Sequence, residues 1–375
     1  MRKVGIVGWR GMVGSVLLNR MKEEHDFNKI NTFFFTTSQA GQKAPQIINA
    51  QPNLLDATSI EELSKMDITI SCQGGDYTEE IYPKLMKKKW QGHWIDAAST
   101  LRMVDSSVII LDPINELMIK KSLDSGNRTW VGGNCTVSLM LLAIHGLLKE
   151  GAVEWVSTMT YQAASGAGAN NMRELIVQMG EIYNSSENEI NRSNFNILDI
   201  DKMVLNKMNS PEFTKENFQV PLAGNLIPWI DKDLGSGLSK EEWKGQEETN
   251  KILFNTFNSI RVDGICTRIG SMRSHSQALT IKLKKNYDID EINDLIKSSN
   301  QWVKLIPNDK ESTINNLTPA AVSGTLNIAI GRIRKLKLED NMISAFTVGD
   351  QLLWGAAEPL RRMLQILINN ENRPV

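Results

Sequence analysis

The chain has 375 residues, more than a single compact core usually spans, so we expect two domains. Its net charge of -1 provides no excess positive charge that would bind nucleic acid or an acidic membrane surface, and neither is expected as a partner. The three cysteines suggest no disulfide framework and are not spaced as metal ligands. We therefore expect no metal, and a reducing, cytoplasmic location for a chain without a signal-peptide pattern.

A glycine turn lies between an apolar strand and an apolar helix near the N-terminus. Residues 3–8 predict a buried strand, and residues 15–21 predict a helix. Between them the glycines Gly8, Gly11 and Gly14 are spaced by three, unlike the commoner G-x-G-x-x-G. Glycines at such a turn let backbone amides approach a pyrophosphate at the helix N-terminus, so we predict a dinucleotide site here.

The residues after the next strand indicate which dinucleotide binds. An NAD enzyme usually carries Asp or Glu after this strand to hold the ribose 2′-hydroxyl. Here residues 32–35 predict the strand, and Thr36, Thr37 and Ser38 follow it. Hydroxyls suit a 2′-phosphate, and Arg10 could pair with that group, so NADP is favoured over NAD. An ordinary Ser/Thr turn is the alternative.

Further strands are predicted at residues 66–72, 94–98, 108–111 and 129–131, alternating with helices. This pattern predicts a mostly parallel sheet whose strands bind ligands at their carboxyl ends. A second glycine turn at Gln73 and the side chain of Arg102 both follow strands and should lie at that edge. Arg102 is either an anion ligand or a solvated charge.

The strand at 129–131 leads to Cys135, which precedes the apolar run 137–144. This run predicts a buried helix with Cys135 at its N-terminus, where the helix dipole favours a thiolate. A thiolate is the nucleophilic form of cysteine. The alternative is a small buried cysteine after a turn.

The pattern changes after residue 150. Residues 153–161 predict a strand, residues 162–171 an open loop, and the polar stretch 180–218 surface structure or a partner-facing insertion. A capping-box pattern at residues 239–242 begins a helix, on which Glu241 and Lys244 share one face. They form either a surface pair or an acid and a base presented to a zwitterionic ligand.

The stretch 260–283 reads as strand with a polar interruption that contains His275. Of the four histidines it is the remaining candidate base, because His145 would lie roughly 15 Å along the helix from Cys135. Arg268 is an odd number of residues away, so joint action with His275 needs a bulge or turn at residues 270–274.

Strands at 328–338 and 343–348 precede a last helical stretch, which Pro359 restarts or kinks.

Together these motifs resemble the aspartate-β-semialdehyde dehydrogenase family, in its bacterial form with long insertions. The resemblance covers almost the whole chain. It rests on seven stretches in the right order: residues 8–14, 72–77, 133–136, 161–166, 241–246, 273–277 and 348–352.

The resemblance implies a Rossmann-like α/β nucleotide domain, residues 1–133 and 357–375, and an α+β catalytic and dimerisation domain, residues 134–356, with a mixed or antiparallel sheet. It implies a homodimer that interconverts L-aspartyl 4-phosphate and aspartate semialdehyde with NADP(H), releasing inorganic phosphate. Cys135 would form a thioester and His275 would be the general acid/base. The substrate would contact Arg102, Asn134, Gln162, Glu241, Lys244 and Arg268. The cofactor would contact Gly8, Arg10, Gly11, Met12, Val13, Thr37, Ser38, Gln73, Ser165, Gly166 and Gln351.

Two other functions remain open. The first is a related phosphorylating dehydrogenase for N-acetyl-glutamyl phosphate or glyceraldehyde 3-phosphate; an acetylated substrate has no free α-ammonium for Glu241. The second is a non-catalytic NADP-binding sensor, which would need neither Cys135 nor His275.

Overall fold

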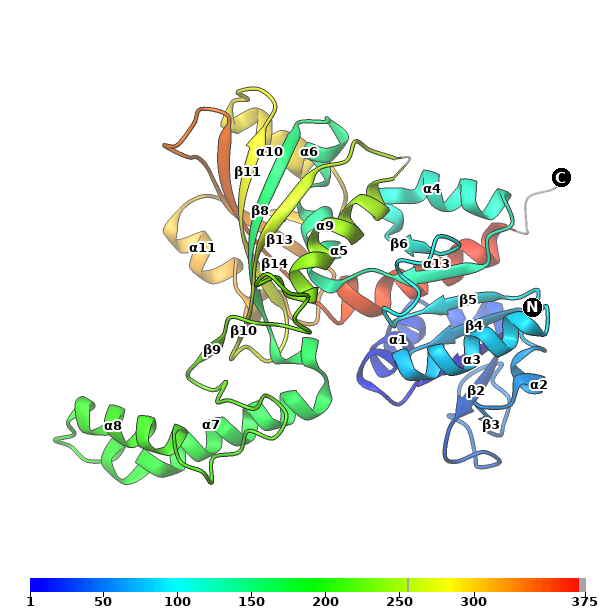
Figure 1. The fold of residues 1–375 in the computed structure, drawn as a ribbon, viewed down its shortest axis with the longest axis horizontal. Helices are drawn as coiled ribbons and strands as arrows, with labels where there is room; N and C mark the ends of the chain where they lie inside the picture. The colour runs from blue at the N-terminus through cyan, green and yellow to red at the C-terminus, as the bar shows by residue number, and fades with distance from the viewer. Residues whose placement is uncertain (255, 371–375) are drawn as a thin grey trace.

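The first seven strands form one parallel sheet, with helices on both faces (Figure 1). The computed structural model describes residues 1–254 and 256–370. Short apolar runs that are buried on both faces favour this arrangement. The strand order is β3-β2-β1-β4-β5-β7-β6, and every pairing is parallel. The strands are β1 (Arg2–Val7), β2 (Ile30–Thr36), β3 (Leu55–Asp56), β4 (Ile68–Ser71), β5 (His93–Asp96), β6 (Val108–Ile110) and β7 (Thr129–Gly132). The helices are α1 (Met12–Glu23), η1 (Asp26–Lys29), α2 (Ile60–Leu63), α3 (Gly75–Lys87) and α4 (Asp112–Asp124).

The second sheet is mixed, as expected, in the order β12-β13-β14-β11-β8-β10-β9. β8 pairs parallel with β10 and antiparallel with β11, so the two strands of the 260–283 stretch lie on opposite sides of β8. The strands are β8 (Val153–Gln162), β9 (Leu226–Ile227), β10 (Arg261–Ile269), β11 (His275–Leu283), β12 (Val303–Leu305), β13 (Ile328–Lys335) and β14 (Met342–Gly349).

Helix α5 (Cys135–Ala143) is the apolar centre of the second body, which is the part of the chain built on the second sheet. Every residue from Thr136 to Ala143 is buried, which explains its lack of a polar face. α5 ends at Ala143, and His145 begins the separate α6 (His145–Lys149), so the single helix predicted through His145 is wrong. The capping box of α9 (Lys240–Leu253) is confirmed, with both of its hydrogen bonds present. The remaining helices of this body are α10 (Ile289–Lys297), α11 (Lys310–Asn316) and α12 (Pro319–Val322).

The polar stretch 180–218 forms most of a projecting helical hairpin, seen apart from the sheets in Figure 1. Its arms are α7 (Ala169–Ile190), which follows the short turn η2 (Ala164–Ala167), and α8 (Ile197–Met208). α8 buries none of its residues within this chain, as expected of surface structure, and the partner-facing alternative stays a prediction.

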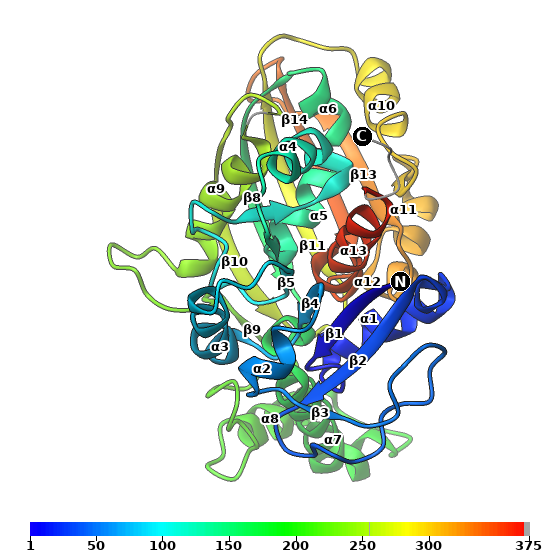
Figure 2. The ribbon, with the colours of Figure 1, turned by 90° about the vertical axis from the view of Figure 1, so that its right-hand side faces the viewer.

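The chain returns to the first sheet at its C-terminal end. A π-helical turn, η3 (Leu353–Ala357), leads into α13 (Glu358–Asn370), so the predicted restart near Pro359 is confirmed. α13 packs on α1 and on β5, β6 and β7 (Figure 2). Buried Arg361 joins α13 to η1 by a hydrogen bond to Asp26 at 3.1 Å, and its hydrogen bond to Glu358 lies within α13. The domain limits stay a prediction, and residues 371–375 lie outside the described residues. Within those described, no helix is both long and apolar enough to cross a membrane.

Candidate active site

Cys135 is the first residue of α5, as predicted, and it lines a cavity of about 570 Å³ between the two sheets. Asn134 caps the helix: its Oδ1 accepts hydrogen bonds from the N–H groups of Thr136, at 2.9 Å, and Val137, at 3.2 Å. The cavity brings together most of the predicted site residues: Met12, Val13, Arg102, Asn134, Cys135, Gln162, Ser165, Gly166, Glu241, Lys244, Arg268 and Gln351.

Helix α9 contributes a buried acid–base pair to this cavity. Lys244 Nζ donates to Glu241 Oε2 at 3.0 Å, and Glu241 Oε1 accepts from Asn134 Nδ2 and Gln162 Nε2, both at 2.9 Å. Burial works against ionisation of Glu241, but the charge of Lys244 and these hydrogen bonds hold the pKa of Glu241 below its usual value. The surface-pair alternative for Glu241 and Lys244 is therefore wrong, because both side chains are buried.

Arg268 and His275 meet across the end of β8, because the chain turns between β10 and β11. Ser274 in that turn has a φ of 72°, so the break required by their odd spacing is present. Arg268 Nη1 donates to the Ala163 carbonyl at 2.8 Å, and the Ala163 N–H donates to His275 Nδ1 at 3.0 Å. Gly166 lies against both side chains: a Cβ there would stand 2.7 Å from Arg268 Nη1 and 3.0 Å from His275 Cε1.

His275 is held as a neutral imidazole. It is 1% exposed, and its Nε2 has no hydrogen-bond partner among the described residues. Burial, and next the positive charge of Arg268, lower the pKa of His275 to about 3. The unpartnered Nε2 lies beside Gly166, which lines the cavity.

Two influences in this structure oppose the expected thiolate character of Cys135. Burial, and next the negative charge of Glu241, raise the pKa of the Cys135 thiol to about 12. Arg268, Arg102 and Lys244 act in the opposite direction without overcoming these effects. The helix N-terminus therefore sets the position of this thiol, while burial and Glu241 oppose its ionisation.

The loops at the ends of β1 and β4 pack so closely that glycine is required at residue 8. Gly8 has a φ of +73°, and a Cβ on it would stand 2.5 Å from the backbone carbon of Cys72. Gly11 caps α1 without a side-chain hydrogen bond, which leaves backbone N–H groups for a phosphate. The turn thus fits a dinucleotide. Gly8, Gly11 and the exposed Gln73 lie outside the residues that line the cavity.

Arg10 lies in the turn between β1 and α1, and its side chain reaches the end of β2, next to the turn expected to hold the 2′-phosphate. Its Nη2 donates to Thr36 Oγ1 at 2.9 Å, and its Nη1 donates to Gln39 Oε1. Thr37 and Ser38 are exposed at the same place. The arginine is therefore held beside hydroxyl groups, and no carboxylate contacts it among the described residues.

Among the residues of the site that the sequence analysis missed, three contact predicted site residues. Asp231 lines the cavity and accepts from Lys244 Nζ at 2.6 Å, and Gly355 packs so closely that a Cβ would stand 2.7 Å from Cys135 Cβ. Glu248 lies behind Arg102 and accepts a hydrogen bond from it at 3.1 Å. A π-turn such as the one containing Gly355 often marks a functional site, but it leaves no sequence signature.

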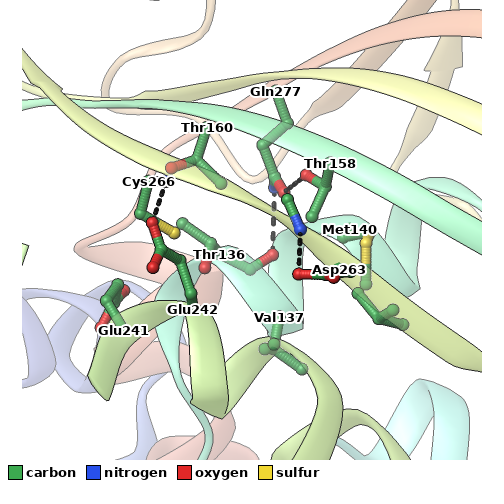
Figure 3. Close-up of a pocket in the computed structure, with 13 residues that line it drawn as sticks. Thr136, Val137, Met140, Thr158, Thr160, Glu241, Glu242, Asp263, Cys266 and Gln277 are labelled. Atoms are coloured by element: carbon green, nitrogen blue, oxygen red, sulfur yellow. Dashed lines mark hydrogen bonds between the residues drawn. The ribbon is translucent and has the colours of Figure 1, made fainter. Parts of the chain in front are cut away.

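A second cavity of about 20 Å³ lies behind α5, between α9 and the second sheet (Figure 3). On one side Gln277 Nε2 donates to the Thr136 carbonyl at 3.0 Å, and Thr158 Oγ1 donates to Gln277 Oε1 at 3.1 Å. These bonds fix the first turn of α5 on the sheet. Cys266 also lines this cavity, and burial raises the pKa of its thiol to about 12.

Both bodies match families of known proteins. Residues 3–122 match the semialdehyde dehydrogenase NAD binding domain, and residues 144–354 match the semialdehyde dehydrogenase dimerisation domain. The fold and these matches define a two-domain semialdehyde dehydrogenase, an oxidoreductase that uses a nicotinamide cofactor.

Solved structures narrow the class. Aspartate semialdehyde dehydrogenase from Francisella tularensis is 52% identical, with 98% of this chain and 100% of that chain covered and a TM-score of 0.93. The chain belongs to the aspartate semialdehyde dehydrogenase family. Two more distant structures share the fold. One is aspartate semialdehyde dehydrogenase II complexed with ASA from Vibrio cholerae, at 20% identity, 99% coverage of both chains and a TM-score of 0.78. The other is the Candida albicans enzyme with NADP, at 15% identity, 98% and 99% coverage and a TM-score of 0.64.

Proposed function

We propose that this enzyme catalyses the NADPH-dependent reductive dephosphorylation of L-aspartyl 4-phosphate to L-aspartate 4-semialdehyde, and the reverse phosphate-dependent oxidation. The reaction would serve lysine, diaminopimelate, threonine and methionine biosynthesis. The observation that carries the proposal is the charge pattern around Cys135: the cations Arg102, Lys244 and Arg268 line one cavity with the carboxylate of Glu241. A small zwitterion with a phosphate matches this pattern.

Each charge of the substrate has a matching side chain. Arg102 and Lys244 would hold the phosphate, with Asn134 beside it, and Arg268 would hold the α-carboxylate. Glu241, whose pKa lies below its usual value, would hold the α-ammonium with the help of Gln162. An N-acetylated substrate has no ammonium group, and a triose phosphate has neither an ammonium nor a carboxylate, so both alternative substrates match less well.

The chemistry begins at Cys135. Its thiol loses a proton as Sγ attacks the acyl carbon, the bond from that carbon to the phosphate oxygen breaks, and a thioester forms while the leaving inorganic phosphate takes up the proton. NADPH, when bound, supplies the hydride that reduces the thioester to the aldehyde level. His275 presents an Nε2–H group beside Gly166, which supports the acid half of the predicted acid/base role.

NADP is the proposed cofactor. The glycine turn fits a dinucleotide, and residues 10–13, Thr37, Ser38 and Gln73 would contact it, with Ser165, Gly166 and Gln351 on the side of the second sheet. The contact of Arg10 with Thr36, and the lack of a carboxylate in residues 36–38, support a 2′-phosphate. The Candida albicans relative was solved with NADP.

We also infer a homodimer in a reducing, cytoplasmic compartment. The match to a dimerisation domain supports self-association, and three free cysteines are consistent with a reducing environment.

The test is NADPH absorbance in the oxidising direction, with L-aspartate semialdehyde, inorganic phosphate and NADP, then NAD. Phosphate-dependent NADPH formation is the expected result. Turnover only with the N-acetyl-glutamyl or triose analogue would keep the mechanism and replace the substrate. No turnover with any of the three aldehydes would contradict the proposal and favour a binding protein.

A further inference from the structure

Glu248 lies on the same face of α9 as Glu241 and Lys244, one turn further along the helix. Glu241 and Lys244 line the cavity, whereas Glu248 lies behind the cavity wall and is 1% exposed. A buried carboxylate costs free energy unless it is paired, so its partners show what it holds.

Both carboxylate oxygens of Glu248 have a partner from the active site. Oε1 accepts from Arg102 Nη1 at 3.1 Å, and Oε2 accepts from the backbone N–H of Asn134 at 2.7 Å. Arg102 Nε also donates to the Gly132 carbonyl at 2.6 Å. The guanidinium is therefore joined to the 132–134 turn twice, directly at Gly132 and through Glu248 at Asn134. Cys135 is the next residue.

A buried ion pair is weak evidence of a role in stability. Apolar residues of similar volume often replace a buried ion pair without loss of stability. A guanidinium has five N–H donors, and the two contacts at Nε and Nη1 fix its plane while further donors stay available to an anion. The same carboxylate fixes the turn that presents the nucleophile.

We propose that Glu248 is a positioning residue that aligns the anion-binding guanidinium of Arg102 with the turn carrying Cys135. The inference rests on the proposed function, because it makes the phosphate of the substrate the anion. Glu248 touches neither substrate nor nucleophile, and it acts through Arg102 and the Asn134 amide.

The decisive variant is Glu248→Gln. The carboxamide has one acceptor oxygen, so it can satisfy either Arg102 or the Asn134 N–H, and its NH2 group then faces the other donor. We expect the KM for inorganic phosphate to rise at least tenfold and kcat to fall, with the KM for NADP changing less than twofold. Isothermal titration of inorganic phosphate into the NADP-loaded protein should show the same loss of affinity without relying on turnover.

A matched control separates positioning from stability. Glu174 is also a buried carboxylate, but it accepts from the backbone N–H groups of Asn217, at 2.6 Å, and Phe218, at 3.0 Å, at the base of the helical hairpin. Glu174→Gln should lower Tm without changing phosphate binding. Should Glu248→Gln fail to fold, Glu248→Asp is measured instead, with an expected phosphate KM above that of the wild type.

Two results would overturn the proposal. Unchanged phosphate affinity with a lower Tm would make Glu248 a structural residue only. Tighter phosphate binding would mean that Glu248 mainly neutralises Arg102. A wild-type protein without phosphate-dependent turnover contradicts the proposed function instead, and the titration still tests whether Glu248 controls anion binding.

Discussion

The backbone N–H of Ala163 donates a hydrogen bond to Nδ1 of His275 at 3.0 Å. A backbone N–H can only donate, so Nδ1 carries a lone pair. Turning the ring over would place a C–H group against this donor, which disfavours the other orientation. The proton of neutral His275 therefore lies on Nε2, and the ring offers a proton donor there.

This tautomer gives a direct spectroscopic prediction. In ¹⁵N-histidine-labelled protein, His275 should show a protonated Nε2 and an unprotonated Nδ1 from pH 8 down to pH 5. Burial and Arg268 lower its pKa to about 3, so it should not become an imidazolium in this range. His275→Gln identifies the signal. An imidazolium at pH 6, or a proton on Nδ1, would contradict the assignment.

The same shift predicts how stability depends on pH. In the unfolded chain His275 binds a proton near pH 6.5, whereas in the folded protein it does so only near pH 3. Between these values the unfolded state binds more protons, so this group lowers the free energy of unfolding as pH falls. His275→Gln removes that contribution. In urea unfolding, the free energy of unfolding of His275→Gln minus that of the wild type should therefore be more positive at pH 4.5 than at pH 7.5. A difference that does not change with pH would argue against a neutral buried ring.

Cys135→Ser tests the thioester. Serine keeps the side-chain size but is a far weaker nucleophile in this cavity, so we expect nearly all reductive activity to be lost while NADPH still binds. Turnover and NADPH fluorescence titration measure the two properties separately. Cys266→Ser is the control, since that thiol lies behind α5 and should not be needed for turnover. Wild-type turnover in Cys135→Ser would remove the thioester from the mechanism.

How far the sequence predicts this site depends on whether a signal is local. The strand that leads to Cys135 and the capping box of Ser239 and Glu242 are properties of a few neighbouring residues. Both are found as expected. The pKa of Cys135 also depends on burial and on Glu241, which is distant in sequence, so the local helix-end argument could not include these two influences. Gly355 was missed for the same reason, because its contact with Cys135 exists only in the folded chain.

Gly166→Ala tests the contact between Arg268 and His275. The added Cβ would stand 2.7 Å from Arg268 Nη1 and 3.0 Å from His275 Cε1, so at least one side chain must move. We expect kcat/KM for the semialdehyde to fall at least tenfold in a protein that still folds, measured by NADPH formation and circular dichroism.

Gly180→Ala is the matched control, because a Cβ at this position in α7 meets nothing within 4 Å. It should leave activity unchanged and raise stability by about 0.5–1 kcal/mol, the usual gain for replacing glycine in a helix. Equal kinetics in the two variants would show that the close packing at Gly166 is not needed for catalysis.

Arg10→Ala tests the preference for NADP. Arg10 is held by Thr36 and Gln39 at the expected 2′-phosphate position, and a charge-assisted hydrogen bond to a phosphate contributes about 1.5–3 kcal/mol. We therefore expect the KM for NADP to rise about 10- to 150-fold, while the KM for NAD, which lacks this phosphate, changes less than twofold. Arg261→Ala, at a side chain that is 76% exposed on β10, is the control and should change neither value. A parallel rise for both cofactors would mean that Arg10 supports the glycine turn as a whole, and the preference for NADP would then have to come from Thr37 and Ser38.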